Sequence, residues 1–558
     1  MINRRQFVTR MSMASAAAAV VLPGLVYSSC YRDTGEYVTV EISHGKIRGM
    51  RSEGVNIFRG IPYAGRVSGD RRFRRPAPLE AWTGVHDTLR LGNPAIQPPN
   101  QTYGINEPQP AEDCLFLNVW TPANDNGKRP VMFYNHGGGF STGSGGSAGQ
   151  DGANLARFFD VVVVETNHRL GIMGYLYLDE IAGADYAGSG NMGMLDIVAG
   201  LEWVNKNIAS FGGDPSNVMI FGESGGGGKT SCLYAMPSAA PYFNKASIES
   251  GPGIRMTPEE TAAQTTALVL KELNINARDW KKLLELPVSL LLDLQLKLPS
   301  LAPRPVTTNR KKGLIESSPG GFSPVVDGVV LPFHPFDPVA PQISKDKPLI
   351  TGWNEDEYNF FGMMSKDKSM FSIGFDELPD RLKPQFGEDT QKIIDTYRKT
   401  RPEASAVDLL VAIQSINMMG LGSVLIAERK AEQGGAPAYL YNFGYKNENV
   451  IPDTDYPMGT PHAMDITFKF YNEQPQKDGT PGTSYWGGSL PERFTASHNM
   501  AELWTTFARN GKPAAKGAPD WPAYNLKNRP MMRIDTKCTV IDNRYAEELK
   551  MWREIGRL

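Results

Sequence analysis

Residues 222–226 are Gly222-Glu223-Ser224-Gly225-Gly226, and they follow the apolar run Val218-Met219-Ile220-Phe221. An apolar run of this length between turn signals indicates a buried strand, and the small residues after Ser224 suit a tightly packed helix start. A G-x-S-x-G sequence between a strand and a helix forms a sharp turn that exposes the serine hydroxyl above a sheet. Because glycine-rich turns containing serine are common, the interpretation depends on the rest of the chain.

A second glycine cluster, His136-Gly137-Gly138-Gly139-Phe140, comes directly after another apolar run, Val131-Met132-Phe133-Tyr134. Glycines after a strand leave backbone N–H groups free to point into a cleft, and such groups stabilise the oxyanion of an acyl-transfer reaction. A flexible or phosphate-binding loop is the alternative. The chain continues Ser141-Thr142-Gly143, without the lysine-serine pair of a phosphate loop.

Strand-like and helix-like segments alternate along the chain, which predicts a mostly parallel sheet with helices on both faces. Long helical stretches over 258–298 and 376–435 are expected to cap the carboxyl ends of the strands, where open α/β sheets carry their sites. No linker or repeat divides the chain, so residues 31–558 are predicted to form one catalytic domain. The segments expected to form this sheet and its first covering helix are strands at 131–134, 161–164, 218–221, 246–251, 348–352 and 438–443 and an amphipathic helix at 194–211.

Residues 1–30 have the pattern of an export signal. Arg4 and Arg5 precede an apolar, alanine-rich run from Met11 to Val26, as in a Tat signal. Pro23-Gly24 interrupts this short run, which disfavours a membrane span. We therefore expect a periplasmic or secreted protein. The segment ends at Cys30, which resembles a lipoprotein cleavage site and raises the hypothesis of a lipid tether.

Composition excludes several other classes of function. The formal net charge of −2 disfavours a nucleic-acid partner, which usually requires a basic face. The seven histidines are scattered and no CxxC or HExxH motif is present, so we expect no metal site. Cys114, Cys232 and Cys538 are too few to indicate a disulfide framework.

The chain resembles the type-B carboxylesterases, a family that includes bacterial para-nitrobenzyl esterases and cholinesterases, over nearly its whole length after the signal. Together the matching motifs are highly specific. They are Phe58 to Ala64, Glu112 to Val119, Asn167-His168-Arg169-Leu170-Gly171 (with histidine in place of the family's tyrosine), Gly190 to Asp196, Asn207 to Pro215, Pro324 to Gly328 and Trp521 to Tyr524.

The resemblance implies an α/β-hydrolase fold and a catalytic triad in the order Ser-Glu-His. The family's serine corresponds to Ser224, and its histidine, in a G-x-x-H segment, to His462. The family's acid lies in a G-x-x-x-D-E segment and corresponds to Glu357. Because Tyr358 replaces the usual following glycine, Glu355 and Asp356 stay open as alternatives.

The resemblance also assigns the oxyanion donors to the N–H groups of Gly138, Gly139 and Gly225. Most family members have alanine where this chain has Gly225, so the placement of this donor could be looser here. The other histidines lack a supporting motif: His498 is expected to face solvent or pack, and His136 to be structural. His168 is expected to be structural, and a place lining the site is the alternative. Cys114 is expected to be a free, buried thiol, because no cysteine occupies the position of its usual disulfide partner. Ser250 could brace the acid, and an ordinary serine at a strand end is the alternative.

The sequence thus predicts a serine carboxylic ester hydrolase that acts on a small-molecule ester through an acyl-enzyme and needs no cofactor. An amide or carbonate hydrolase with the same machinery is the first alternative, and a non-catalytic binding protein of the same fold is the second. The natural substrate and the oligomeric state are not readable from the sequence. Several aromatic residues are expected either to line the mouth of the site or to belong to the core: Phe140, Trp353, Phe360, Phe361, Tyr485 and Trp486.

Overall fold

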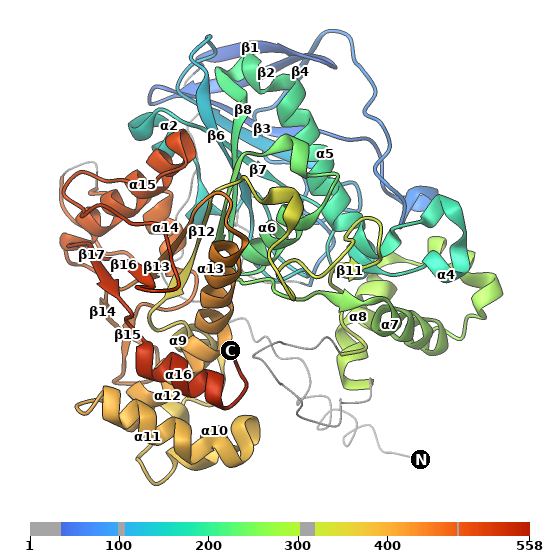
Figure 1. The fold of residues 1–558 in the computed structure, drawn as a ribbon. Helices are drawn as coiled ribbons and strands as arrows, with labels where there is room; N and C mark the ends of the chain where they lie inside the picture. The colour runs from blue at the N-terminus through green and yellow to red at the C-terminus, as the bar shows by residue number, and fades with distance from the viewer. Residues whose placement is uncertain (1–34, 99–106, 302–317, 477–478) are drawn as a thin grey trace.

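The computed structural model describes residues 35–98, 107–301, 318–476 and 479–558 (Figure 1). The predicted signal segment and Cys30 lie outside the described residues. Most of the described chain is built around a 13-stranded sheet.

The strands from β7 to β16 run parallel, and the sheet becomes antiparallel toward both edges. The predicted strand at 218–221 is longer than expected, because it extends over the whole of β8. In spatial order the strands are β1 (Tyr37–Ile42), β2 (Gly45–Ser52), β3 (Val55–Pro62), β5 (Phe116–Thr121), β7 (Val162–Thr166), β6 (Arg129–Asn135), β8 (Gly213–Glu223), β9 (Lys245–Glu249), β12 (Leu349–Asn354), β13 (Ala438–Phe443), β16 (Pro530–Ile534) and β17 (Thr539–Asp542), with β4 (Val85–Asp87) paired to β2.

Helices cover both faces of the sheet (Figure 1). In β8, Val218 and Ile220 pack in one hydrophobic core, whereas Met219 and Phe221 pack in another on the opposite face, as the two-residue period of a strand requires. The first core includes residues of α5, and the second includes residues of α15. The helices of the first half of the chain are α2 (Ala153–Phe159), α3 (Gly171–Tyr175), α4 (Asp179–Ala182), α5 (Met192–Asn207), α6 (Gly225–Ala235), α7 (Glu259–Glu272) and α8 (Val288–Leu301).

The second half adds helices at the carboxyl side of the sheet and on its faces. They are α9 (Tyr358–Met364), α10 (Leu378–Phe386), α11 (Thr390–Thr400), α12 (Ala406–Ser415), α13 (Leu421–Gln433), α14 (Met464–Lys469), α15 (Glu492–Asn510) and α16 (Ala546–Glu554). Two short strand pairs lie outside the main sheet, namely β10 (Thr257–Pro258) with β11 (Val325–Val326), and β14 (Asn447–Val450) with β15 (Pro457–Gly459).

The predicted helical cap is present in part. Helices α7 and α8, and helices α9 to α12, lie beyond the strands in the lower part of Figure 1. Helix α13, which closes the second predicted cap region, instead packs along β12 and β13. The predicted cap region 376–435 therefore extends too far along the chain. Helix α13 buries its apolar side chains against the sheet and belongs to the core.

Residues 406–433 are long and apolar enough to cross a membrane by length and composition alone, and no other described helix meets that criterion. In the fold, 67% of the most apolar window of this stretch is buried. The stretch comprises α12, a π-helical turn at Ile416–Gly420 and α13, and the packing of α13 on the sheet accounts for its apolar character.

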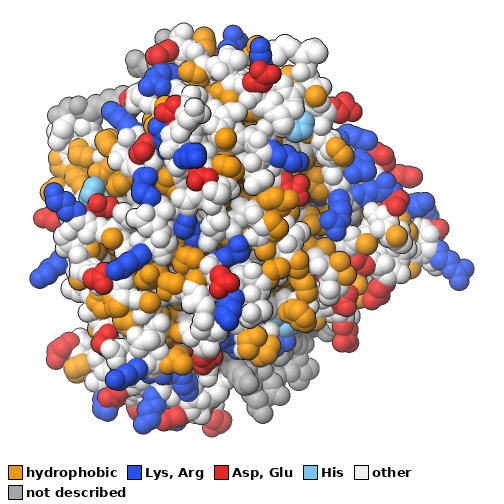
Figure 2. Space-filling model, turned by 45° about the horizontal axis from the view of Figure 1, so that its top comes forward, with side chains coloured by type: hydrophobic (Ala, Val, Ile, Leu, Met, Phe, Trp, Pro, Cys, Tyr) orange, Lys and Arg blue, Asp and Glu red, His pale blue; other side chains and the backbone are white. Residues whose placement is uncertain are grey.

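The surface carries charges of both signs. On the face shown in Figure 2, Lys and Arg side chains alternate with Asp and Glu side chains, and hydrophobic side chains lie between them.

The carboxyl ends of three central strands meet at one level, since Glu223 of β8 pairs with Glu249 of β9, and Glu249 pairs with Gly352 of β12. Ser224 follows the end of β8, and Glu357 follows the end of β12.

Candidate active site

Ser224 occupies a sharp turn between β8 and α6. Its φ of 57° and ψ of −124° lie in a region that residues with a side chain rarely adopt. A Cβ added at Gly222 would lie 2.6 Å from the carbonyl oxygen of Asn135, and one added at Gly226 would overlap the same oxygen. The turn therefore requires glycine on both sides of Ser224, and Ser224 itself is only half-buried.

Glu357 and His462 lie in direct contact beside this turn. Glu357 Oε2 is 2.6 Å from His462 Nδ1. Its other oxygen, Oε1, accepts hydrogen bonds from the Ser250 hydroxyl at 2.5 Å and the Asn354 backbone N–H at 2.7 Å. Ser250 follows β9 and Asn354 ends β12, so two strand ends hold the carboxylate in place. Ser250 therefore makes the hydrogen bond to Glu357 that a bracing role requires.

The two alternative acids have other partners. Asp356 binds Lys446 Nζ at 2.5 Å and accepts the Thr460 N–H at 2.8 Å. Glu355 forms ion pairs with Lys446, Arg533 and Arg544. Although burial alone would raise the pKa of Glu355, these cations lower it to about 2. The geometry therefore favours Glu357 over both alternatives.

A second carboxylate also faces His462, and the sequence reasoning did not single it out. Glu223 Oε1 is 3.3 Å from His462 Nδ1, and no described residue donates a hydrogen bond to that oxygen. Burial raises the pKa of Glu223 to about 8, against the opposing effect of His462. Its position immediately before Ser224 was the available signal, but side-chain direction at a strained turn is not readable from spacing.

The two carboxylates change the protonation of the histidine. Burial alone would lower the pKa of His462, but the negative charges of Glu223 and Glu357 together raise it to about 9. A histidine that acts as a general base must be neutral, so a raised pKa moves the onset of activity toward alkaline pH.

Replacing Glu223 by glutamine is expected to move the acidic limb of the kcat/KM–pH profile down by roughly one pH unit, because one negative charge beside His462 is removed. The measurement is kcat/KM for an uncharged ester between pH 5 and 10. Glu547→Gln is the control, since Glu547 is exposed and pairs with Lys399 on the surface. An unchanged limb in Glu223→Gln would contradict this electrostatic account.

Behind these acids lies a buried ionic network. Lys469 of α14 contacts Glu249 and lies 3.2 Å from Asp465, and all three side chains are completely buried. Asp465 also accepts a hydrogen bond from the Asn354 side chain at 3.1 Å. These contacts connect α14, which follows His462, to the ends of β9 and β12. Removing one partner of such a network would leave an uncompensated buried charge.

The glycine loop lies against the serine turn. A Cβ added at Gly137 would lie 3.5 Å from Ser224 Cβ, and one added at Gly225 would overlap the backbone of Gly139. Gly138 and Gly139 have φ of 81° and 61°, which turns the backbone sharply here. Within the described part of the chain, the N–H groups of Gly138, Gly139 and Gly225 have no hydrogen-bond acceptor.

The comparisons with known proteins show to which family the chain belongs. A sequence model of the carboxylesterase family matches residues 36–552. The chain belongs to the carboxylesterase family. It is 32% identical to the para-nitrobenzyl esterase of Bacillus subtilis (strain 168) over 92% of this chain and 98% of that protein, and 30% identical to the phenmedipham hydrolase of Pseudarthrobacter oxydans over 89% and 95%.

The solved structure of a carboxylesterase from Geobacillus stearothermophilus is 35% identical, with a TM-score of 0.76 over 92% of this chain and 99% of that chain. The predicted α/β-hydrolase fold is thereby confirmed. Together with the family membership, these relatives identify this carboxylesterase as a carboxylic ester hydrolase.

The aromatic residues expected near the site separate into two groups. Phe360 and Phe361 lie with ring centroids 5.6 Å and 5.3 Å from the imidazole of His462, and Trp486 stacks on Phe360 at 6.3 Å. Trp353, in contrast, is 1% exposed and belongs to the core, because its side chain points from β12 toward the helices that cover it. Phe140 packs edge-on against Tyr175.

His498 and Cys114 lie in the environments that the sequence predicts. His498 is exposed on α15 near Glu502, whereas His136 and His168 are buried and stack with ring centroids 4.5 Å apart. Cys114 is a free, buried thiol. Among the described residues, no group of three or more His, Cys, Asp or Glu side chains could hold a metal ion.

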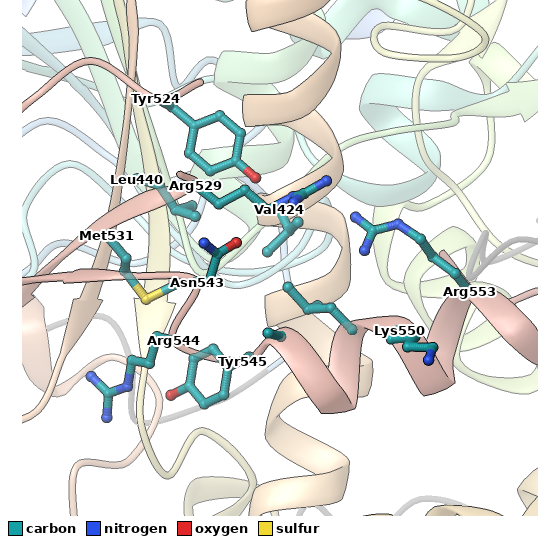
Figure 3. Close-up of a pocket in the computed structure, with 12 residues that line it drawn as sticks. Val424, Leu440, Tyr524, Arg529, Met531, Asn543, Arg544, Tyr545, Lys550 and Arg553 are labelled. Carbon is teal, nitrogen blue, oxygen red and sulfur yellow. The ribbon is translucent and has the colours of Figure 1, made fainter. Parts of the chain in front are cut away.

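A cavity of about 170 Å³ lies between α13, β13, β16 and α16 (Figure 3). Its lining includes Arg529 and Arg553, whose guanidinium groups both pair with Glu428. None of the predicted catalytic residues lines it, so this cavity is separate from the candidate active site.

Proposed function

We propose that this carboxylesterase hydrolyses esters through an acyl-enzyme, with Ser224 as nucleophile, His462 as general base and Glu357 as the acid that orients it. The 2.6 Å contact between Glu357 and His462, beside the strained turn of Ser224, is the observation that carries the proposal. A serine hydroxyl is a weak nucleophile and needs such a base to take its proton.

The proposed reaction follows from the orientation of the imidazole. Because Nδ1 faces Glu357, Nε2 is the nitrogen that takes the proton as Ser224 Oγ attacks the ester carbonyl. The carbonyl oxygen becomes an oxyanion, which the N–H groups of Gly138, Gly139 and Gly225 stabilise. His462 then gives the proton to the leaving alcohol, and a water molecule activated by the same imidazole releases the acid. No step needs a cofactor.

The aromatic side chains beside His462 support a preference for substrates with an apolar or aromatic group. Phe360, Phe361 and Trp486 together present apolar ring surface next to the reacting atoms. Amide and carbonate substrates would pass through the same steps and differ in the leaving group.

The proposal is tested with p-nitrophenyl esters from acetate to palmitate, with p-nitroacetanilide as the amide comparison. We expect ester turnover that exceeds anilide turnover, and labelling by a fluorophosphonate at the peptide that contains Ser224. Faster anilide turnover would favour the amidase alternative. Absence of both turnover and labelling in folded protein would favour a non-catalytic binding protein.

A further inference from the structure

Lys229 is a buried cation next to the proposed oxyanion loop. It lies on α6, five residues after Ser224, and is 0% exposed. Its ammonium group donates a 2.8 Å hydrogen bond to the carbonyl oxygen of His136 and lies 3.4 Å from that of Gly137. The Lys229 side chain therefore connects helix α6 to the start of the glycine loop.

No carboxylate neutralises this cation. Among the described residues, no Asp or Glu side chain forms an ion pair with Lys229, whereas the buried Lys469 has both Glu249 and Asp465. Burial lowers the pKa of Lys229 to about 7. Because an unpaired buried charge is costly, burial favours the neutral amine, and Nζ needs hydrogen-bond partners in either protonation state.

The titratable groups that face Lys229 are two histidines, and neither supplies negative charge. Burial, together with the charge of Lys229, lowers the pKa of His136 and of His168 well below the usual value, so both imidazoles are neutral. The ring of Phe140 also lies nearby, with its centroid 5.9 Å from Lys229 Nζ. The surroundings of the ammonium group thus consist of carbonyl dipoles and rings.

The two carbonyl groups belong to the peptide units that form the loop. The carbonyl of Gly137 and the N–H of Gly138 are parts of one peptide group, and the Gly138 N–H is a proposed oxyanion donor. His136 Nδ1 also lies 2.9 Å from the Gly137 oxygen. Hydrogen bonds accepted by a carbonyl polarise its peptide group and strengthen the N–H on the other side.

We propose that Lys229 is a positioning residue of the oxyanion hole, which holds the loop 136–139 through hydrogen bonds from its Nζ to the carbonyl oxygens of His136 and Gly137. The inference rests on the proposed function of the loop. It explains the burial of Lys229 without a carboxylate partner, because its Nζ donates to loop carbonyls and the Gly138 N–H lies on the far side of one of those peptide groups.

Lys229→Met removes the ammonium group and keeps an unbranched side chain that can fill the same space. We expect kcat for p-nitrophenyl acetate to fall roughly 10- to 100-fold with KM changed less than about twofold, because the interaction grows only as charge develops. An aryl trifluoromethyl ketone provides a test without turnover. Ser224 Oγ bonds to its carbonyl carbon, the serine proton passes to His462, and the former carbonyl oxygen becomes an oxyanion in the glycine loop. Its Kd should rise by the same factor as kcat falls.

Lys430→Met is the matched control. Lys430 is also buried on a helix, α13, and its ammonium group also donates to backbone carbonyls, those of Ser344 and Lys345. It should change kcat and the ketone Kd by less than about threefold, although it removes an equivalent buried cation. Thermal unfolding checks that each variant is folded, and Lys229→Gln replaces Lys229→Met if that variant does not fold.

Two outcomes would overturn the inference. One is a folded Lys229→Met variant with wild-type kcat and wild-type ketone affinity. The other is a loss of turnover that leaves the ketone Kd unchanged, which indicates a role outside oxyanion stabilisation. Failure of the proposed function is distinguishable, since the wild-type protein itself would then neither turn over esters nor bind the ketone.

Discussion

Ser224→Ala is expected to lower kcat for p-nitrophenyl esters by roughly 10⁴-fold or more, because the variant has no nucleophile for the acyl-enzyme. The residual rate should come from substrate binding and the oxyanion donors, so KM should change little. The strained backbone at position 224 is set by the strand and helix on either side, and alanine removes only the hydroxyl. The measurement is single-turnover and steady-state hydrolysis by purified protein.

Ser216→Ala is the control for the loss of a serine hydroxyl. Ser216 is exposed and lies on the same strand, β8, with its hydroxyl bonded to Asp214. It should retain wild-type kcat and fluorophosphonate labelling, whereas Ser224→Ala should lose both. Near-normal turnover by folded Ser224→Ala would refute the assignment of the nucleophile.

Glu357→Gln is expected to lower kcat by roughly 10²- to 10⁴-fold. The amide keeps the size of the side chain but removes the negative charge that orients His462 and stabilises its protonated form. The Ser250 hydroxyl and the Asn354 N–H can still donate to the amide oxygen, which leaves the NH₂ group to face His462 Nδ1. The imidazole would then present the wrong nitrogen to Ser224.

Asp356→Asn tests whether the loss of kcat in Glu357→Gln would follow from removing any negative charge in this segment. Asp356 contacts Lys446 and Thr460, so its replacement should lower kcat by less than roughly tenfold and affect mainly thermal stability. The same kinetic assay compares the two variants at several pH values. If Asp356→Asn is the more damaging change, the acid of the triad is assigned to the wrong residue.

Much of the fold was predictable because its signals are local. The apolar runs that became β6, β7, β8, β9, β12 and β13 were placed from the sequence, as was the helix now seen as α5 with a 3-10 turn after it. A strand that is buried on both faces must be apolar throughout, and that requirement is visible in a few consecutive residues. The boundary of the cap was wrong at α13, because an apolar helix has the same pattern whether it covers a cap or a sheet.

The candidate site was predictable to the level of its motifs. Ser224, Glu357 and His462 came from a turn motif and from family resemblance, and the structure places the last two in contact. The second carboxylate, Glu223, and the buried cation, Lys229, were not singled out. Their roles depend on which buried atoms lie next to them, and neither residue type nor spacing in the sequence predicts those neighbours.

The sequence by itself determined the strand-turn-helix around Ser224 and the glycine loop, since glycine positions and apolar periodicity act over a few residues. Its resemblance to the carboxylesterases implied the reaction class. Only the tertiary structure decided which acid meets His462, that Trp353 belongs to the core, and that Lys229 lies beneath the loop without a carboxylate partner. These features arise where strand ends far apart in the chain converge. There, burial and the distance between charges, rather than residue type, determine what each side chain does.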